Sequence, residues 1–153
     1  MRTALLPASL VLVAACSSSS TKSPHTRELP NDEARKVLLD RNWIEEMPKT
    51  ERDRFHVYRF VPSMGGGVFQ DRTIFKGTFE LFQFETAADE IRFNLLETHQ
   101  KVVSKFRIDE VDGPKPFDLK LTINADPRGP QVYYGMRAET DRDGSKLEAR
   151  LHH

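Results

Sequence analysis

The stretch FDLKLTIN, residues 117–124, alternates apolar and polar side chains without a break. Successive side chains of a β-strand point to opposite faces, so this alternation predicts an antiparallel strand with one buried and one solvated face. The same two-residue period recurs in residues 91–95 and 106–109. The sequence therefore predicts a mainly β fold.

We expect about eight short strands, joined by turns rich in Gly, Pro, Asp and Ser. Their expected ranges are 42–47, 54–62, 67–74, 75–85, 90–98, 102–110, 117–124 and 131–137. Alternating strands at near-even spacing are typical of a sandwich or an up-and-down barrel. Ten phenylalanines suit the inner face of a barrel, and closure removes the exposed strand edges. We expect an antiparallel up-and-down barrel.

Residues 75–85 carry two apolar phases. Phe79 and Leu81 occupy one phase, whereas Phe82 and Phe84 occupy the other. An extra residue in a bent strand produces such a shift, so the pattern predicts a β-bulge.

A short helix is expected before the first strand. Asn31 is a suitable N-cap residue, and Ala34, Val37 and Leu38 follow at helical spacing as one apolar stripe. The helix is expected to end near Asp40.

This order of elements resembles the lipocalin and calycin barrels, in which a Gly-x-Trp motif opens the first strand. Trp43 matches the tryptophan, whereas Arg41 stands where the glycine belongs. In that family an arginine near the end of the last strand packs across the tryptophan and closes the base of the barrel. The resemblance covers residues 41–137 and implies that Arg137 has this role.

The N-terminus has the features of a secretory signal. Arg2 precedes an apolar run over residues 4–15, and this run is shorter than the about 20 residues that a membrane span needs. Val13-Ala14-Ala15-Cys16 then resembles the lipobox of bacterial lipoproteins. The resemblance implies removal of residues 1–15 and attachment of lipid to Cys16.

Ser17 follows the lipobox cysteine, where an aspartate favours retention in the inner membrane in this family. The resemblance therefore implies anchoring in the outer membrane of the cell envelope. We expect residues 16–29 to form a flexible tether and residues 30–138 to form the barrel domain. Residues 139–153, rich in alternating charge, are expected to be a mobile tail.

The composition of the chain argues against nucleic acid as a partner. Lys and Arg equal Asp and Glu in number, and loss of Arg2 with the signal leaves a net charge of −1. Nucleic-acid binding usually needs a basic face, so no nucleic acid is expected. Cys16 is the only cysteine and excludes an intrachain disulfide.

We expect neither a metal nor a cofactor. Glu139, Asp141, Asp143 and Gly144 have the spacing of the first half of an EF-hand loop, but Arg150 stands where the bidentate glutamate belongs. The two C-terminal histidines offer too few ligands for a structural site.

Nothing in the sequence indicates an enzyme. There is no Gly-x-Ser-x-Gly elbow, and the one cysteine is assigned to lipid. Glu97 and His99 share a face as a possible general-base pair, but a histidine near a strand end is usually exposed. We expect no catalytic activity.

The expected strand 54–62 carries a polar group on each face. His56, Tyr58 and Phe60 share one face, whereas Arg59 lies on the other. A buried polar group costs several kcal/mol unless it is paired, so it needs a protein, water or ligand partner. The candidate ligand-binding residues are Trp43, His56, Tyr58, Arg59, Tyr133, Tyr134 and Arg137.

Two functions remain open. In the first, the barrel of an envelope lipoprotein binds a small hydrophobic or amphipathic molecule. In the second, the barrel is filled by its own side chains and binds an envelope protein, as a scaffold or inhibitor. The space left inside the barrel distinguishes them.

Overall fold

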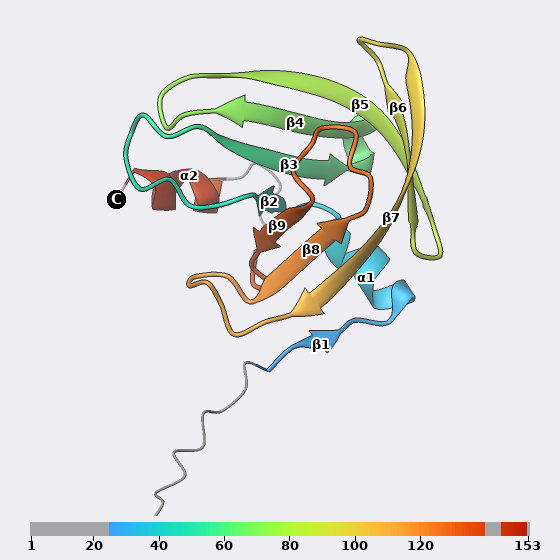
Figure 1. Cartoon of the computed structure of the whole chain (residues 1–153), viewed down its shortest axis with the longest axis horizontal. Coiled ribbons are helices and arrows are strands. Elements are labelled where there is room, and N and C mark those ends of the chain that lie inside the picture. The colour runs from blue at the N-terminus through green and yellow to red at the C-terminus, as the bar shows by residue number, and fades with distance from the viewer. Residues whose placement is uncertain (1–24, 140–144, 153) are drawn as a thin grey trace, which may run out of the picture.

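A computed structural model of the chain describes residues 25–139 and 145–152 (Figure 1). The elements in chain order are β1 (Arg27–Glu28), α1 (Asn31–Leu38), β2 (Asn42–Ile44), β3 (Phe55–Val61), η1 (Pro62–Met64), β4 (Gly66–Arg72), β5 (Gly77–Ala87), β6 (Glu90–Leu95), β7 (Gln100–Glu110), β8 (Leu119–Ile123), β9 (Val132–Gly135) and α2 (Ser145–Leu151).

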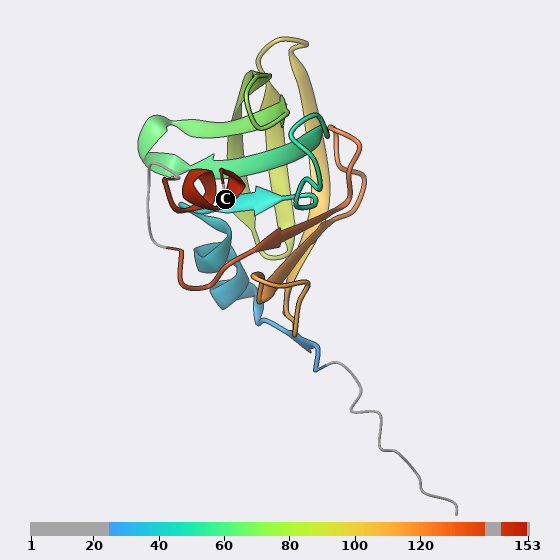
Figure 2. The same ribbon diagram turned by 90° about the vertical axis from the view of Figure 1, so that its left-hand side faces the viewer.

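Strands β2 to β9 form a closed, eight-stranded, antiparallel barrel. Each strand pairs with the next along the chain, and β9 returns to β2, where Ile44 pairs with Tyr134. Figures 1 and 2 show the sheet curving round to meet itself. The expected up-and-down barrel is confirmed.

In the alternating stretch 117–124, the apolar residues of β8 lie on the inner face of the barrel. Leu119, Leu121 and Ile123 of β8 are fully buried in the barrel interior, whereas Lys120 and Thr122 between them are partly exposed. Phe117 precedes β8 and is buried in a second cluster, on the outside of the barrel.

The expected β-bulge is wrong. Leu81 pairs with Val68 and Phe82 with Gly67, and the register of β4 and β5 continues without an extra residue. Since successive residues alternate faces, Leu81 lies outside, 48% exposed, while Phe82 lies inside, 1% exposed. The apolar residues of β5 therefore change from the outer to the inner face.

Helix α1 lies below the barrel in Figure 2 and confirms the expected short helix. Its apolar residues Ala34, Val37 and Leu38 are buried against the barrel core. The Trp43 indole N–H donates to the Leu38 carbonyl oxygen at 2.9 Å and ties the end of the helix to β2.

The tether ends earlier than residue 29. Arg27 and Glu28 form β1, which pairs with the end of β7. Leu29 is buried, and its N–H donates to the Ile108 carbonyl oxygen at 2.8 Å. This apolar residue fixes the chain to the barrel just before α1.

Arg137 does not pack across Trp43. Its guanidinium lies between Glu33 of α1, at 2.9 Å, and Glu110 of β7, at 2.6 Å. Gly135 lies against the Trp43 indole instead, and a Cβ at position 135 would lie 3.0 Å from the ring. Arg137 thus joins α1 to the barrel wall by ion pairs.

Arg41, which replaces the glycine of the lipocalin motif, is buried at the same end of the barrel. Its Nη1 donates to the Met136 carbonyl oxygen at 2.8 Å. The neighbouring Asn42 donates through Nδ2 to Glu139 Oε1 at 2.6 Å. Burial lowers the Arg41 pKa, whereas the nearby Glu139 carboxylate opposes that shift.

Part of the expected mobile tail is packed. Leu147 and Leu151 of α2 are four residues apart and share one helix face. They are buried in the second cluster, whose other buried members are Ile44, Phe55, Val57, Phe117 and Met136. Glu148 forms an ion pair with Arg72. The expectation is therefore wrong for Ser145–Leu151, whereas residues 140–144 and 153 lie outside the described residues.

We predict that Leu151→Ala lowers the free energy of unfolding by about 2–3 kcal/mol, because it leaves a cavity over the second cluster. The exposed Arg150→Ala should change it by less than about 0.5 kcal/mol. Chemical denaturation of the full chain measures both. Equal effects of the two variants would show that α2 does not cover the barrel.

Candidate functional site

The two faces of β3 have different surroundings. His56, Tyr58 and Phe60 point into the barrel; Tyr58 and Phe60 are part of its aromatic core. On the opposite face, Val57 belongs to the cluster covered by α2, and Arg59 is buried, with 8% exposed. The inward polar groups are thus His56 and Tyr58.

The tyrosine hydroxyls meet a protein carboxylate. Tyr58 donates to Asp126 Oδ1 at 2.8 Å, and Tyr133 donates to Asp126 Oδ2 at 2.6 Å. The Arg128 N–H also donates to Asp126 Oδ1, at 2.9 Å. Asp126 lies in the loop between β8 and β9 (Figure 1). This loop therefore supplies the partner that the buried tyrosines need.

Burial governs the titration of this cluster. It raises the Asp126 pKa, although the hydrogen bonds from Tyr133, the Arg128 N–H and Tyr58 oppose the shift. Burial and the nearby carboxylate also raise the pKa of both tyrosines. The two hydroxyls consequently remain neutral donors at physiological pH.

A second residue of the same loop holds it against the barrel wall. Arg128 forms an ion pair with Glu80 of β5, and its guanidinium lies over the Phe69 ring, 5.5 Å from the centroid. Together Asp126 and Arg128 attach the β8–β9 loop to inward side chains of β3, β4, β5 and β9.

His56 lies beside this cluster. Its Nδ1 is 2.6 Å from Glu45 Oε2, and its Nε2 is 3.7 Å from Asp71 Oδ1. The ring stacks on Phe69 with centroids 5.4 Å apart. Within residues 25–139 and 145–152, no group of three or more His, Cys, Asp or Glu side chains is placed to hold a metal.

Aromatic rings occupy the middle of the barrel. The Tyr58 ring has five aromatic neighbours with centroids between 4.8 and 6.1 Å away: Phe60, Phe69, Phe82, Phe93 and Tyr133. Such spacings are those of packed aromatic pairs. These rings occupy the interior of the barrel around Tyr58.

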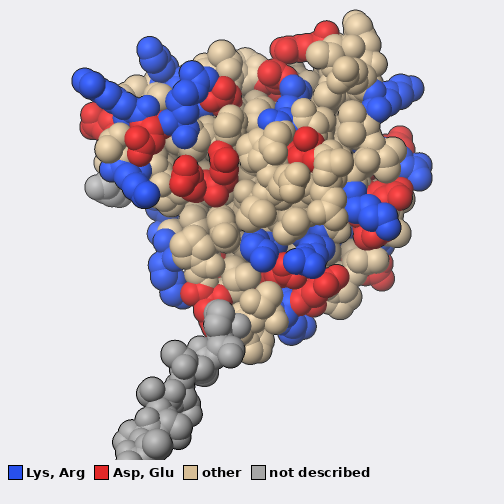
Figure 3. Space-filling model, in the orientation of Figure 1, with Lys and Arg blue, Asp and Glu red and all other residues tan. Residues whose placement is uncertain are grey.

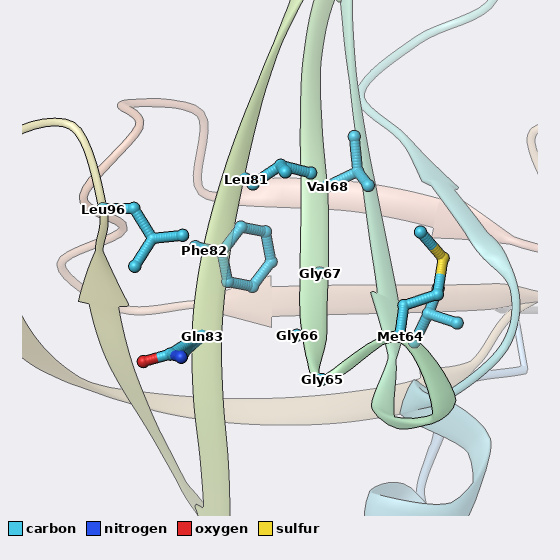
Figure 4. Close-up of a pocket in the computed structure, with 10 residues that line it drawn as sticks. Met64, Gly65, Gly66, Gly67, Val68, Leu81, Phe82, Gln83 and Leu96 are labelled. Atoms are coloured by element: carbon cyan, nitrogen blue, oxygen red, sulfur yellow. The ribbon is translucent and has the colours of Figure 1, made fainter.

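Apolar side chains lie on the outside of the barrel; Figure 4 shows Met64, Val68, Leu81 and Leu96 of this surface. We call it the outer apolar patch and define it by Met64, Val68, Phe79, Leu81 and Leu96. All but Val68 are exposed, between 42% and 71%. Val68 pairs with Leu81 on the neighbouring strand, and Leu96 follows the end of β6 beside them.

A hollow of about 180 Å³ opens in this patch beside Gly66 and Gly67. A Cβ at Gly66 would lie 2.1 Å from the Phe82 carbonyl oxygen, and one at Gly67 would lie 2.4 Å from the Phe82 ring. Only glycine fits these positions: Gly66 leaves the outer surface depressed, whereas Gly67, which pairs with the inward Phe60 and Phe82, leaves room for the Phe82 ring inside the barrel. A wider hollow of about 570 Å³ along β5, β6 and β7 shares Gly65 and Gln83 with it, and its lining includes Phe84, Phe93 and Val102 of the interior cluster.

The structure separates the residues that the sequence proposed as one ligand site. Only His56, Tyr58 and Tyr133 meet at the Asp126 end. Trp43 contacts α1, Arg59 lies on the outer face, and Arg137 pairs with two glutamates. Tyr134 stacks on Phe117 outside the barrel, with centroids 5.9 Å apart.

The sequence does not point to Asp126 and Arg128 as site residues, because residues 125–130, ADPRGP, have only the composition of a turn. The outer apolar patch was not expected either, although its signal is the change of apolar phase in residues 75–85. Glu97 and His99 lie in the exposed turn between β6 and β7.

We predict an effect of Asp126 on the pH dependence of stability. Since its pKa is raised in the folded state, the folded state binds the proton more tightly than the unfolded state. Stability from this group is therefore present at low pH and is lost as pH rises through the raised pKa. The difference in unfolding free energy between wild type and Asp126→Asn should fall from pH 4 to pH 7. Urea denaturation at several pH values measures it, and a difference that grows with pH would contradict the prediction.

No protein-family model, curated protein or solved structure matches this chain. In the part of the chain that the structure describes, no helix has the length and apolar character required to cross a bilayer. The structure agrees with the lipocalin resemblance in one respect, the closed eight-stranded barrel.

Proposed function

We propose that the protein is a bacterial envelope lipoprotein whose lipocalin-like barrel acts through its outer surface by binding protein. In this proposal acyl chains on Cys16 hold the domain at the outer membrane. The lipobox-like segment before Cys16 and the serine after it support the anchor and its location. Two or more acyl chains give stable anchoring, whereas one gives only marginal binding.

The aromatic packing around Tyr58 carries the choice of protein binding over ligand binding. Aromatic rings surround Tyr58, and its hydroxyl is already paired with Asp126. A small ligand would have to displace these rings and the loop contact. The inward polar groups are thus accounted for by contacts within the chain.

The outer apolar patch supports binding at the surface. Monomeric proteins rarely expose large contiguous apolar areas without a partner, yet Phe79 and Met64 are 68% and 71% exposed. On the face shown in Figure 3, basic and acidic side chains are interspersed. That face has no field of one sign that would favour a highly charged partner.

The anchor predicts the behaviour of two variants. In a diderm bacterium, the full chain should incorporate labelled palmitate and sediment with membranes, and Cys16→Ala should lose both properties. By resemblance to the family, Ser17→Asp should keep the label but move to the inner membrane. Ser18→Ala is the matched control, expected to behave as wild type. Membrane fractionation of Cys16→Ala identical to that of wild type would refute the anchor.

The packing of the barrel interior leads to a prediction for the fluorescence of Trp43. Trp43 is fully buried in the barrel core, so a ligand entering the barrel should change its emission. We expect that a panel of fatty acids and phospholipids leaves the emission of the full chain unchanged in wavelength and intensity. A saturable shift with any of them would instead favour an interior ligand site.

A further inference from the structure

We propose that the partner of the outer apolar patch is a second copy of this chain, packed face to face. The two-fold axis lies in the interface between the copies, at right angles to the direction of β5, and passes beside the Leu81 side chain. This pairing deepens the proposed surface role, on which it rests, by naming the partner. A two-fold interface uses the same surface on both copies, so the patch must be complementary to itself.

The patch carries both a projection and a hollow. Phe79 projects from β5, 68% exposed, and the hollow of about 180 Å³ opens at Gly66 and Gly67 of β4. That hollow is lined mainly by apolar groups, including Val61, Val68 and Phe82. An aromatic ring from a second copy would find apolar contacts there.

The register of the strands brings these features together. Phe79 precedes Leu81 by two residues and Gln83 follows it by two, so each lies about 7 Å from Leu81 along β5. Gly67 pairs with Phe82, the residue next to Gln83. With the axis at right angles to β5 through Leu81, Phe79 of one copy faces the hollow of the other.

The centre of the patch is uncharged, and its ends are complementary. Gln70 and Gln83 are the polar outward residues next to Phe79 and Leu81. Beyond them, Lys76 immediately precedes β5 and Glu85 lies four residues past Leu81 within it, and both are exposed. The proposed axis places Lys76 of each copy near Glu85 of the other, so the same ion pair forms twice.

These ion pairs would mainly set the alignment of the two copies. Exposed pairs contribute little affinity, and Arg92 already lies opposite Glu85 within the same sheet. The apolar patch would form the centre of the interface and the polar residues around it the rim, as in interfaces of the standard size of about 800 Å² per partner. Burial of Phe79 and Leu81 would supply most of the attraction.

Cysteine crosslinking tests the second copy directly, because a residue on a two-fold axis meets itself. The full chain carrying Leu81→Cys is expressed in a diderm bacterium and oxidised on whole cells. We expect at least fivefold more crosslinked dimer than with Val103→Cys, which is 57% exposed on β7 outside the patch. Equal yields, or a Leu81→Cys product with the mass of a complex with another protein, would overturn the proposal.

A charge exchange tests the orientation in the Leu81→Cys background. Lys76→Glu and Glu85→Lys should each reduce the dimer yield at least threefold, and the two together should restore it. A double variant no better than the single ones would overturn the two-fold arrangement. Lipid attachment is measured separately by palmitate labelling, so a failed dimer and a failed anchor give different results.

Discussion

The carboxylate of Asp126 connects the centre of the barrel to the loop that lies over it. It accepts hydrogen bonds from Tyr58 of β3 and Tyr133 of β9, two fully buried residues on strands distant in sequence. Without this acceptor, the Tyr58 hydroxyl would be buried and unpaired, at a cost of about 1–3 kcal/mol, and the Tyr133 hydroxyl would keep only the Pro130 carbonyl oxygen, at 3.1 Å. The buried hydroxyl of Tyr58 thus depends on the loop, and the loop depends on the aromatic core that positions this hydroxyl.

The strand β5 links the interior to the outer surface. Its first half points Glu80 inward, where this residue meets Arg128 of the loop, and therefore points Phe79 and Leu81 outward. Its second half points Phe82 into the core. Because side chains alternate strictly along a strand, the register that turns Glu80 inward also turns its neighbours Phe79 and Leu81 outward. The outer apolar patch follows from the same register that fixes the loop.

The mainly β fold and the barrel could be predicted from alternation alone, since residues such as Leu119 and Leu121 repeat with period two over many strands. The helix could be predicted from the spacing of Ala34, Val37 and Leu38. The Asp126 cluster could not be predicted, because it joins a turn to two strands through contacts that leave no local pattern. In residues 75–85 the change of phase was visible, but a bulge and an outward apolar face give the same pattern.

The second cluster shows how the chain treats an apolar area on the outside of this barrel. Phe55 and Val57 point outward from β3, and α2 covers them with Leu147 and Leu151. On β4 and β5 the outward Val68, Phe79 and Leu81 form a comparable surface, and most of it stays exposed among the described residues. Both surfaces carry apolar side chains that point away from the interior of the barrel. One is covered by the chain itself, and the same physical demand on the other favours a cover from a second molecule.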